Sequence, residues 1–366
     1  MGDCKPLPRV FVILQKLASL KFTVIVLALI AMLVIAGTIC QAQLGIYAAQ
    51  QKVFTSWIFW IFGILPLPGM LLAGILFLIN LLATLACRFS WRRPPLGLLL
   101  IHVGLLLLTG GGFFIAATAQ ESFVTLAEGE SGDYSTASSD WEIAIEARRG
   151  ANAQMWAVDV ADLRLGRESA VADSDVGITM DEYRANCRMI AAGPNEKNRV
   201  DSLPPALDPA ENIPGIHLLV RSGRETGSVF LFGGENSSTS LHLGDAEFAL
   251  SLRLKHWPLP LKLKLLDFRK TMYAGSEIVK SFTSLVEIET KGARRQAVIS
   301  MNRPLRFREY TFYQSAYGED TGQGESSTFS VVRSTGRWLP YAASALLFLG
   351  LAVHFLGKLM ARSRRA

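Results

Sequence analysis

The chain has 366 residues, 50% apolar and only 19% charged, which excludes a disordered protein, a coiled coil and a small disulfide-stapled fold. Residues 118–336 hold 24 Lys and Arg against 30 Asp and Glu, whereas the basic excess of the remaining chain lies beside long apolar runs. The net charge of +6 therefore indicates membrane topology and not a nucleic-acid-binding surface.

Four apolar stretches are long enough to cross a membrane as helices of about 20 residues. They are residues 22–40, 69–87, 96–117 and 338–357. The first stretch is longer than the apolar part of a signal peptide, so we expect it to remain as a helix. The segment 53–68 contains Trp57, Trp60 and the helix-breaking pair Pro66 and Pro68. Because tryptophan favours the headgroup level, this segment is predicted to be interfacial or re-entrant.

Basic clusters mark three segments: the N-terminus (1–21), the turn at 88–95 and the C-terminal tail (358–366). The positive-inside rule predicts that all three are cytoplasmic. An even number of spans returns both termini to one side, so residues 118–336 are expected outside the membrane. Three of the spans then occupy residues 22–117, and the fourth occupies 337–357.

The large external segment is predicted to be rich in β-strands. Apolar and polar residues alternate with period two in Trp141–Ala147 and in Glu247–Leu254, among other runs. About ten short strands of this kind favour one or two antiparallel sandwiches, with a long loop or joint at 191–215. The expected fold class is therefore a membrane α-helical part of four transmembrane helices plus a large extracytoplasmic mainly-β domain.

Two histidines lie inside apolar spans, His102 in the third and His354 in the fourth. Ionisable side chains within a membrane are costly and commonly functional, and neutral imidazole is an axial ligand of haem iron. Counted from Pro95 and from Lys358, both lie about 5–10 Å inside the cytoplasmic leaflet. The alternative is structural: an imidazole near a helix end can hydrogen-bond a backbone carbonyl or a headgroup.

Other candidate sites carry weaker signals. His217, His242 and His256 stand alone in strand-like surroundings, so no metal site is expected among them. Only Cys40 and Cys187 share the predicted outer, oxidising side, so a disulfide bond between them is conceivable, although nothing in their spacing pairs them. The alternative is that all four cysteines are small apolar fillers. The chain has no Cys-x-x-Cys pair and no nucleotide-binding or hydrolase motif, so no catalytic residue is assigned.

A signature in the second half of the chain resembles a known family. It consists of Asn302-x-Pro304-Leu305 followed by Tyr313-Gln314-Ser315-x-Tyr317. This pattern, and the layout of three spans, a large domain and a final span, resemble the ResB family, the membrane subunits of the system II machinery for cytochrome c biogenesis. Asn and Pro favour a turn and the aromatic run is strand-like, so we expect the signature residues to be structural.

The resemblance implies a subunit that delivers haem across the bacterial cytoplasmic (inner) membrane and supports its covalent attachment to apocytochrome c. It implies non-covalent haem b in transit, shared with a tryptophan-rich membrane partner subunit of the CcsA/ResC type. His102 matches the family's haem ligand early in the third span, and His354 matches a histidine in the last span of relatives. The chain would be one subunit of a cytochrome c synthase, or haem lyase, and not an enzyme alone. The alternative function is a membrane-anchored extracytoplasmic scaffold or binding module that binds no haem.

Overall fold

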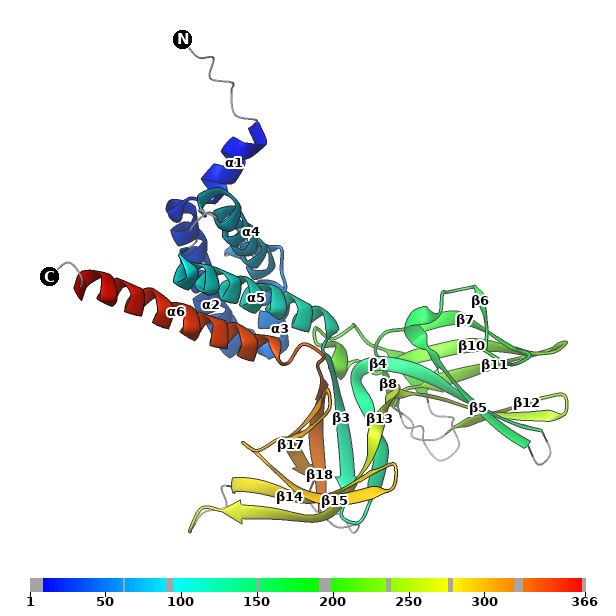
Figure 1. Ribbon diagram of the computed structural model, residues 1–366. Helices are drawn as coiled ribbons and strands as arrows, with labels where there is room; N and C mark the ends of the chain where they lie inside the picture. Colours follow the sequence, from blue (N-terminus) through cyan, green and yellow to red (C-terminus); the bar gives the residue numbers. More distant parts are fainter. Residues whose placement is uncertain are drawn as a thin grey trace. The chain divides into compact units, whose positions relative to one another are not determined.

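The computed structural model describes residues 9–61, 63–89, 95–149, 152–190, 199–234, 238–275, 279–318 and 325–363 (Figure 1). The chain divides into two compact units. The helical unit comprises residues 1–119 and 334–366, and the β unit comprises Gln120–Arg333.

The helical unit contains the four expected spans. Its helices are α1 (Arg9–Leu17), α2 (Leu20–Leu44), α3 (Ile46–Ala49), the π-helical turn η1 (Gln50–Phe54), α4 (Met70–Arg88), α5 (Leu96–Thr118) and α6 (Leu339–Ser363). Four of these, α2, α4, α5 and α6, are long and apolar enough to cross a membrane. The interfacial segment is not helical beyond η1, because β1 (Ile58–Ile61) and β2 (Leu65–Pro68) form a hairpin there. Helix α1 lies within the basic N-terminal segment, for which no element was predicted.

A buried asparagine joins three helices of this unit. Asn80 on α4 is 1% exposed. Its Nδ2 donates to the carbonyl of Leu17 at 2.6 Å, and its Oδ1 accepts from the hydroxyl of Thr23 at 3.0 Å. An amide buried among apolar side chains is costly unless it is hydrogen-bonded. The two bonds therefore fasten α4 to the corner between α1 and α2.

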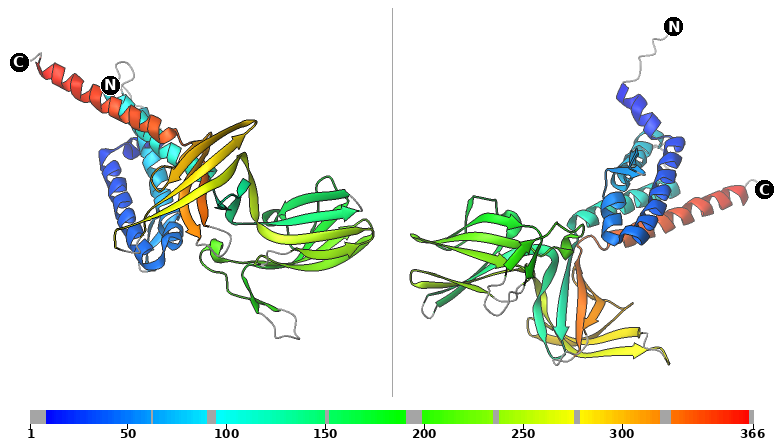
Figure 2. Two further views of the ribbon diagram at one scale, coloured as in Figure 1. Left: turned by 90° about the horizontal axis from the view of Figure 1, so that it is seen from below. Right: turned by 180° about the vertical axis from the view of Figure 1, so that it is seen from behind.

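Helices α5 and α6 pack side by side along a row of glycines (Figures 1 and 2). Gly97, Gly104 and Gly111 are the buried residues of α5 and are spaced seven apart. A Cβ atom on Gly97 would lie 2.6 Å from the backbone nitrogen of His354, and one on Gly104 would lie 2.9 Å from Cγ of Leu347. Small residues let membrane helices approach closely, so this glycine seam sets the distance between α5 and α6.

The β unit is built from antiparallel pairs. Its strands are β3 (Gln120–Ala127), β4 (Ser131–Arg149), β5 (Asn152–Asp159), β6 (Glu168–Ala170), β7 (Val176–Arg184), β8 (Cys187–Ile190), β9 (Arg199–Ser202), β10 (Gly215–Ser222), β11 (Glu225–Phe232), β12 (Thr239–Leu243), β13 (Ala246–Met272), β14 (Val279–Thr290), β15 (Ala293–Ser300), β16 (Leu305–Phe307), β17 (Tyr310–Gly318) and β18 (Ser326–Arg333). A ten-stranded sheet has the order β15-β14-β13-β4-β3-β18-β17-β16, with β5 beside β4 and β12 beside β13. A four-stranded sheet has the order β11-β10-β7-β6, and β8 pairs with β9.

Two hydrophobic cores share the long strand β13. In the first core, one half of β13 and its neighbour β4 pack against the four-stranded sheet, around Ile145, Ile216 and Phe248. This half is the expected sandwich. In the second core, the other half of β13 curls with β3 and with β14 to β18 around Phe312 and Phe329. That curled sheet was not predicted.

The expectation of uniformly short strands is wrong for β4 and β13, which have 19 and 27 residues. Their pairing shifts register between Leu254 and His256 and again between Pro258 and Leu263. Residues such as Pro258 therefore bend β13 without ending it. Of the predicted loop at 191–215, the described part holds β9 and a short 3-10 turn (Pro209–Glu211), and residues 191–198 lie outside the described residues.

Candidate functional site

His102 lies in the second turn of α5 with one ring nitrogen already engaged. Its Nδ1 is 2.8 Å from the backbone carbonyl of Leu98. A carbonyl oxygen can only accept, so in the neutral ring Nδ1 carries the hydrogen and Nε2 keeps its lone pair. The ring of Phe89 stands edge-on to the imidazole at 6.3 Å. The bond to Leu98 is consistent with a structural role, because it satisfies one ring nitrogen. It is equally consistent with haem ligation, because metal-ligating histidines are oriented by a hydrogen bond from their other nitrogen.

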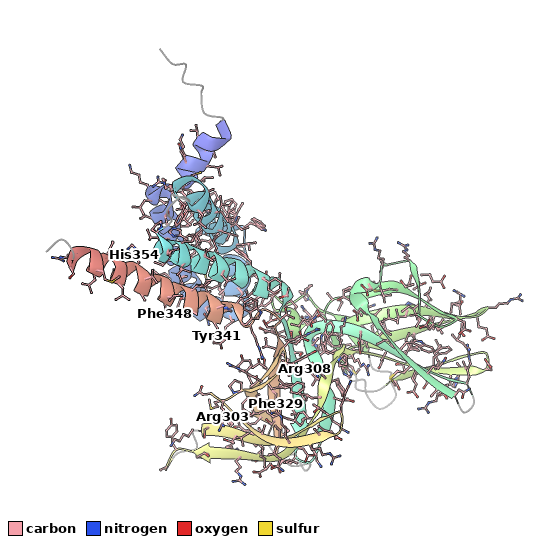
Figure 3. All side chains as sticks on the ribbon, in the orientation of Figure 1. Arg303, Arg308, Phe329, Tyr341, Phe348 and His354 are labelled. Carbon is pink, nitrogen blue, oxygen red and sulfur yellow. The ribbon has the colours of Figure 1, made fainter. Side chains whose placement is uncertain are left out.

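His354 lies on α6, in the half nearer its C-terminal end (Figure 3). Its backbone lies against Gly97 of α5, and its ring stands edge-on to Phe355 at 5.6 Å. Gly350, one turn earlier, lies equally close to α5, because a Cβ there would be 2.8 Å from the backbone nitrogen of Ile101. Gly350 therefore makes room for α5. A Cβ on the other nearby glycine, Gly357, would meet no atom within 4 Å among the described residues.

The two histidines lie on different sides of α5. Successive residues of an α-helix are about 100° apart, so His102 is about 140° around α5 from Gly97 and about 160° from Gly104. Those glycines face α6. The imidazole of His102 is therefore on the face of α5 that is turned away from α6, the helix that carries His354.

Two of the signature residues, Tyr313 and Gln314, are neighbours on β17. Gln314 on β17 donates from Nε2 to Oγ of Ser327 at 2.8 Å, and its Oε1 accepts from the hydroxyl of Ser284 at 2.7 Å. Ser284 and Ser327 are fully buried, and their hydroxyl oxygens are 3.0 Å apart. Ser284 belongs to β14 and Ser327 to β18, so Gln314 joins two strands that three other strands separate in the sheet order. Tyr313, the neighbouring residue, is 41% exposed.

The remaining signature residues also make packing or turn contacts. Tyr317 stacks on Phe268 at 5.8 Å and lies 4.8 Å from the ring of Phe282. Asn302 and Pro304 lie in the turn between β15 and β16, where the backbones of Ser300 and Arg303 hydrogen-bond each other.

The isolated histidines of the β unit remain separate. Within the described part of the chain, no three His, Cys, Asp or Glu side chains gather into a group that could hold a metal ion. His217 lies 3.3 Å from Asp181, and His256 stacks on Tyr134 at 4.0 Å. Burial lowers the pKa of His256, and the charge of Arg253 lowers it further.

The described cysteines are free. They are Cys40, Cys87 and Cys187. Cys4 lies outside the described residues. Burial raises the pKa of the Cys187 thiol, so it stays protonated at neutral pH, as a small apolar side chain would be.

The profile of the ResB-like family matches residues 85–327, about two thirds of the chain. The chain belongs to the ResB-like family. Membership of the ResB-like family implies a part in cytochrome c biogenesis. The matched range contains His102 and the whole signature from Asn302 to Tyr317, whereas His354 lies beyond it. No curated protein matches the chain.

Proposed function

We propose that this ResB-like chain holds haem in its helical unit through His102 and delivers it for covalent attachment to apocytochrome c. The support is the geometry of His102. Leu98 fixes the Nδ1 side of the ring, so the Nε2 lone pair is presented from an apolar helix, where an uncompensated imidazole would otherwise be costly. Nε2 of a neutral imidazole is an axial ligand for haem iron, and haem here is the cargo.

The second axial ligand of a haem on His102 is assigned to the tryptophan-rich partner of the CcsA/ResC type. His354 is poorly placed for that role, because it packs on the face of α5 opposite to His102. The present chain has only seven tryptophans, dispersed along the sequence, and lacks a tryptophan-rich motif of its own. His354 then either holds a second haem against the partner or stabilises the α5–α6 pair.

Haem content of the co-purified complex tests this proposal. His102→Ala should lower haem per complex and cytochrome c maturation while leaving membrane insertion intact, because alanine is easier to place in lipid than imidazole. His102→Gly with added imidazole should restore part of both, since free imidazole can fill the vacated axial position. The control is His242→Ala, an exposed histidine on β12, which should leave the haem spectrum unchanged.

A His102→Ala complex with wild-type haem stoichiometry and spectrum would contradict the proposal. If the double variant with His354→Ala also kept its haem, the membrane-anchored scaffold that binds no haem would be the better description. His354→Ala alone separates the two roles of that residue: loss of haem indicates a ligand, and loss of stability at constant haem per protein indicates packing.

The orientation that haem delivery requires can be tested separately. The basic segments at 1–21, 88–95 and 358–366 favour a cytoplasmic location for both termini and an external β unit, in a bacterial cytoplasmic membrane. A reporter that is active only outside the membrane should work when fused near residue 200. It should fail when fused after Arg88 or at Ala366. Activity of the fusion after Arg88 would contradict the four-span topology.

A further inference from the structure

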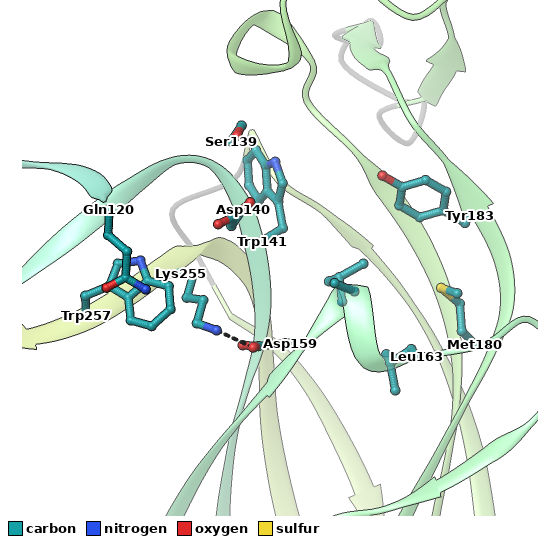
Figure 4. Close-up of a pocket in the computed structure, with 12 residues that line it drawn as sticks. Gln120, Ser139, Asp140, Trp141, Asp159, Leu163, Met180, Tyr183, Lys255 and Trp257 are labelled. Atoms are coloured by element: carbon teal, nitrogen blue, oxygen red, sulfur yellow. Dashed lines mark hydrogen bonds and ion pairs between the residues drawn. The ribbon is translucent and has the colours of Figure 1, made fainter. Parts of the chain in front are cut away.

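The β unit contains a hollow of about 650 Å³ at the bends of its two long strands (Figure 4). Trp141 on β4 and Trp257 on β13 line one part of it, and Met180 and Tyr183 on β7 line another. The hollow therefore receives side chains from both the ten-stranded and the four-stranded sheet. Concave sites with aromatic walls at such junctions are common places for ligands.

The walls of this hollow already hold one ammonium group. Nζ of Lys255 lies 4.2 Å from the ring centre of Trp257 and forms an ion pair with Asp159 (Figure 4). An indole face next to a carboxylate is an arrangement that attracts cations. Asp140, on the same hollow, is exposed at the surface. The lining thus offers a second carboxylate beside aromatic rings.

The strand that carries Tyr183 has an open edge. Residues Glu182–Arg184 continue the pairing of β7 with β10 on one side, after a bulge at Asp181. On the other side, β6 reaches only to Thr179, and Leu165 makes a single bridge to Met180. No further strand among the described residues pairs with that edge beyond Met180. An unpaired strand edge can accept an extended peptide through main-chain hydrogen bonds.

Charge favours a cationic peptide at this edge. Asp181 and Glu182 precede Tyr183, and Asp140 and Asp159 lie in the hollow. Arg184 pairs with Glu182 and Lys255 pairs with Asp159, so the excess negative charge is that of Asp140 and of Asp181, which lies 3.3 Å from His217. Residues 118–336 as a whole carry 30 acidic and 24 basic side chains. Complementary charge accelerates encounter and selects the partner.

We propose that the open edge of β7 and the adjoining hollow bind an extended, lysine-bearing segment of unfolded apocytochrome c. The peptide backbone pairs with Glu182–Arg184, and a lysine side chain enters the hollow beside Asp140. Tyr183 and Trp257 contact its aliphatic stem. The identity of the partner rests on the proposed function, whereas the site itself rests on the strand edge, the aromatic walls and the carboxylates.

Binding of synthetic peptides to the full chain in nanodiscs tests this site without haem. The probe is a fluorescent, lysine-containing peptide in which the haem-attachment cysteines are serines, measured by fluorescence anisotropy. We expect the same peptide with glutamate in place of lysine to bind at least about tenfold more weakly. A peptide with alternate backbone amides methylated should also bind about tenfold more weakly, since its methylated amides cannot donate hydrogen bonds to a strand edge.

Protein variants locate the site on the chain. Asp140→Asn should weaken binding about two- to fivefold, as expected for one exposed ion pair, and Tyr183→Ala about tenfold, as expected for an aromatic anchor. The matched control is Asp133→Asn, an exposed aspartate on the same strand as Asp140 that does not line the hollow. It should bind like the wild type.

Three results would overturn the proposal: no binding of the lysine peptide to the wild-type chain, equal binding of the methylated peptide, or equal binding by Asp140→Asn and Tyr183→Ala. The methylated peptide needs no protein variant, so it decides the question even if Tyr183→Ala fails to fold. None of these results depends on haem. Failure here leaves the assignment of His102 standing, and failure of that assignment leaves the peptide affinities unchanged.

Discussion

The glycine seam between α5 and α6 allows a sharp test of the helix packing. In Gly97→Ala, the new Cβ would lie 2.6 Å from the backbone nitrogen of His354 and 2.7 Å from its Cα and Cβ. Comfortable contacts between such atoms are about 3.5–4.0 Å, so the shortfall is about 1 Å. The atoms in the way belong to the backbone and its first side-chain carbon, so no rotamer change relieves the clash. The helices must separate at this point.

Overpacking of this kind costs about 1–3 kcal/mol, and we expect Gly97→Ala to lie at the upper end of that range. Gly104→Ala should cost less, because its nearest neighbour is the side chain of Leu347. The control is Gly110→Ala on the same helix, whose Cβ would meet no atom within 4 Å among the described residues. That change should be neutral or slightly stabilising, because alanine favours helix more than glycine does.

The measurement is the free energy of unfolding of the helical unit in bicelles by steric trapping, for the wild type and the three variants. If Gly97→Ala were as stable as Gly110→Ala, the close approach of α5 and α6 at His354 would be refuted. Haem content gives a second readout. If His102 holds haem as proposed, Gly97→Ala should retain it, because His102 lies on the other face of α5.

Three further outcomes follow from the β unit. Gln314→Leu leaves the buried hydroxyls of Ser284 and Ser327 with fewer partners, so it should lower the free energy of unfolding by about 1–3 kcal/mol with haem per protein unchanged. Burial lowers the pKa of His256, so the unfolded chain takes up a proton first as pH falls through about 6.5. Wild-type stability should therefore fall from about pH 7.5 to about pH 5.5, and His256→Gln should flatten that dependence in denaturant titrations at the two pH values. Affinity for the lysine peptide should fall as salt is raised from about 50 to about 500 mM, and no change would exclude an electrostatic contribution.

The helical unit was largely predictable because its elements depend on local composition. Length and hydropathy placed the four spans to within a few residues, and the Pro66 and Pro68 pair correctly excluded a helix before Met70. Helix α1 was missed because the N-terminal segment was interpreted only through its basic charge, although Arg9–Leu17 has the apolar periodicity of a short amphipathic helix. The spacing of Gly97, Gly104 and Gly111 was present in the sequence, and a period of seven is itself a signal for a helix-packing face.

The β unit was predictable in class but not in its pairing. Alternation identified strands, yet it cannot show that a bend at Pro258 continues β13 instead of ending it. The hollow at that bend needs Trp141, Trp257 and Tyr183 from three different strands, and only the pairing brings them together. The position of His102 within an apolar helix was evident from the sequence, whereas the placement of His354 on the opposite side of α5 required the packing of α5 on α6.

The pairing of β3 with β18 has a consequence for biogenesis. Gln120 pairs with Arg333, its partner 213 residues later, so the first and last strands of the β unit are neighbours. During synthesis, the edge of β3 that pairs with β18 therefore stays unpaired until nearly the whole β unit has been made. Such distant pairings fold slowly and leave strand edges open to aggregation. The β3–β18 pairing can form only after β18 has left the ribosome. Slowing synthesis just before residue 326 should therefore prolong the sensitivity of the β unit to proteases.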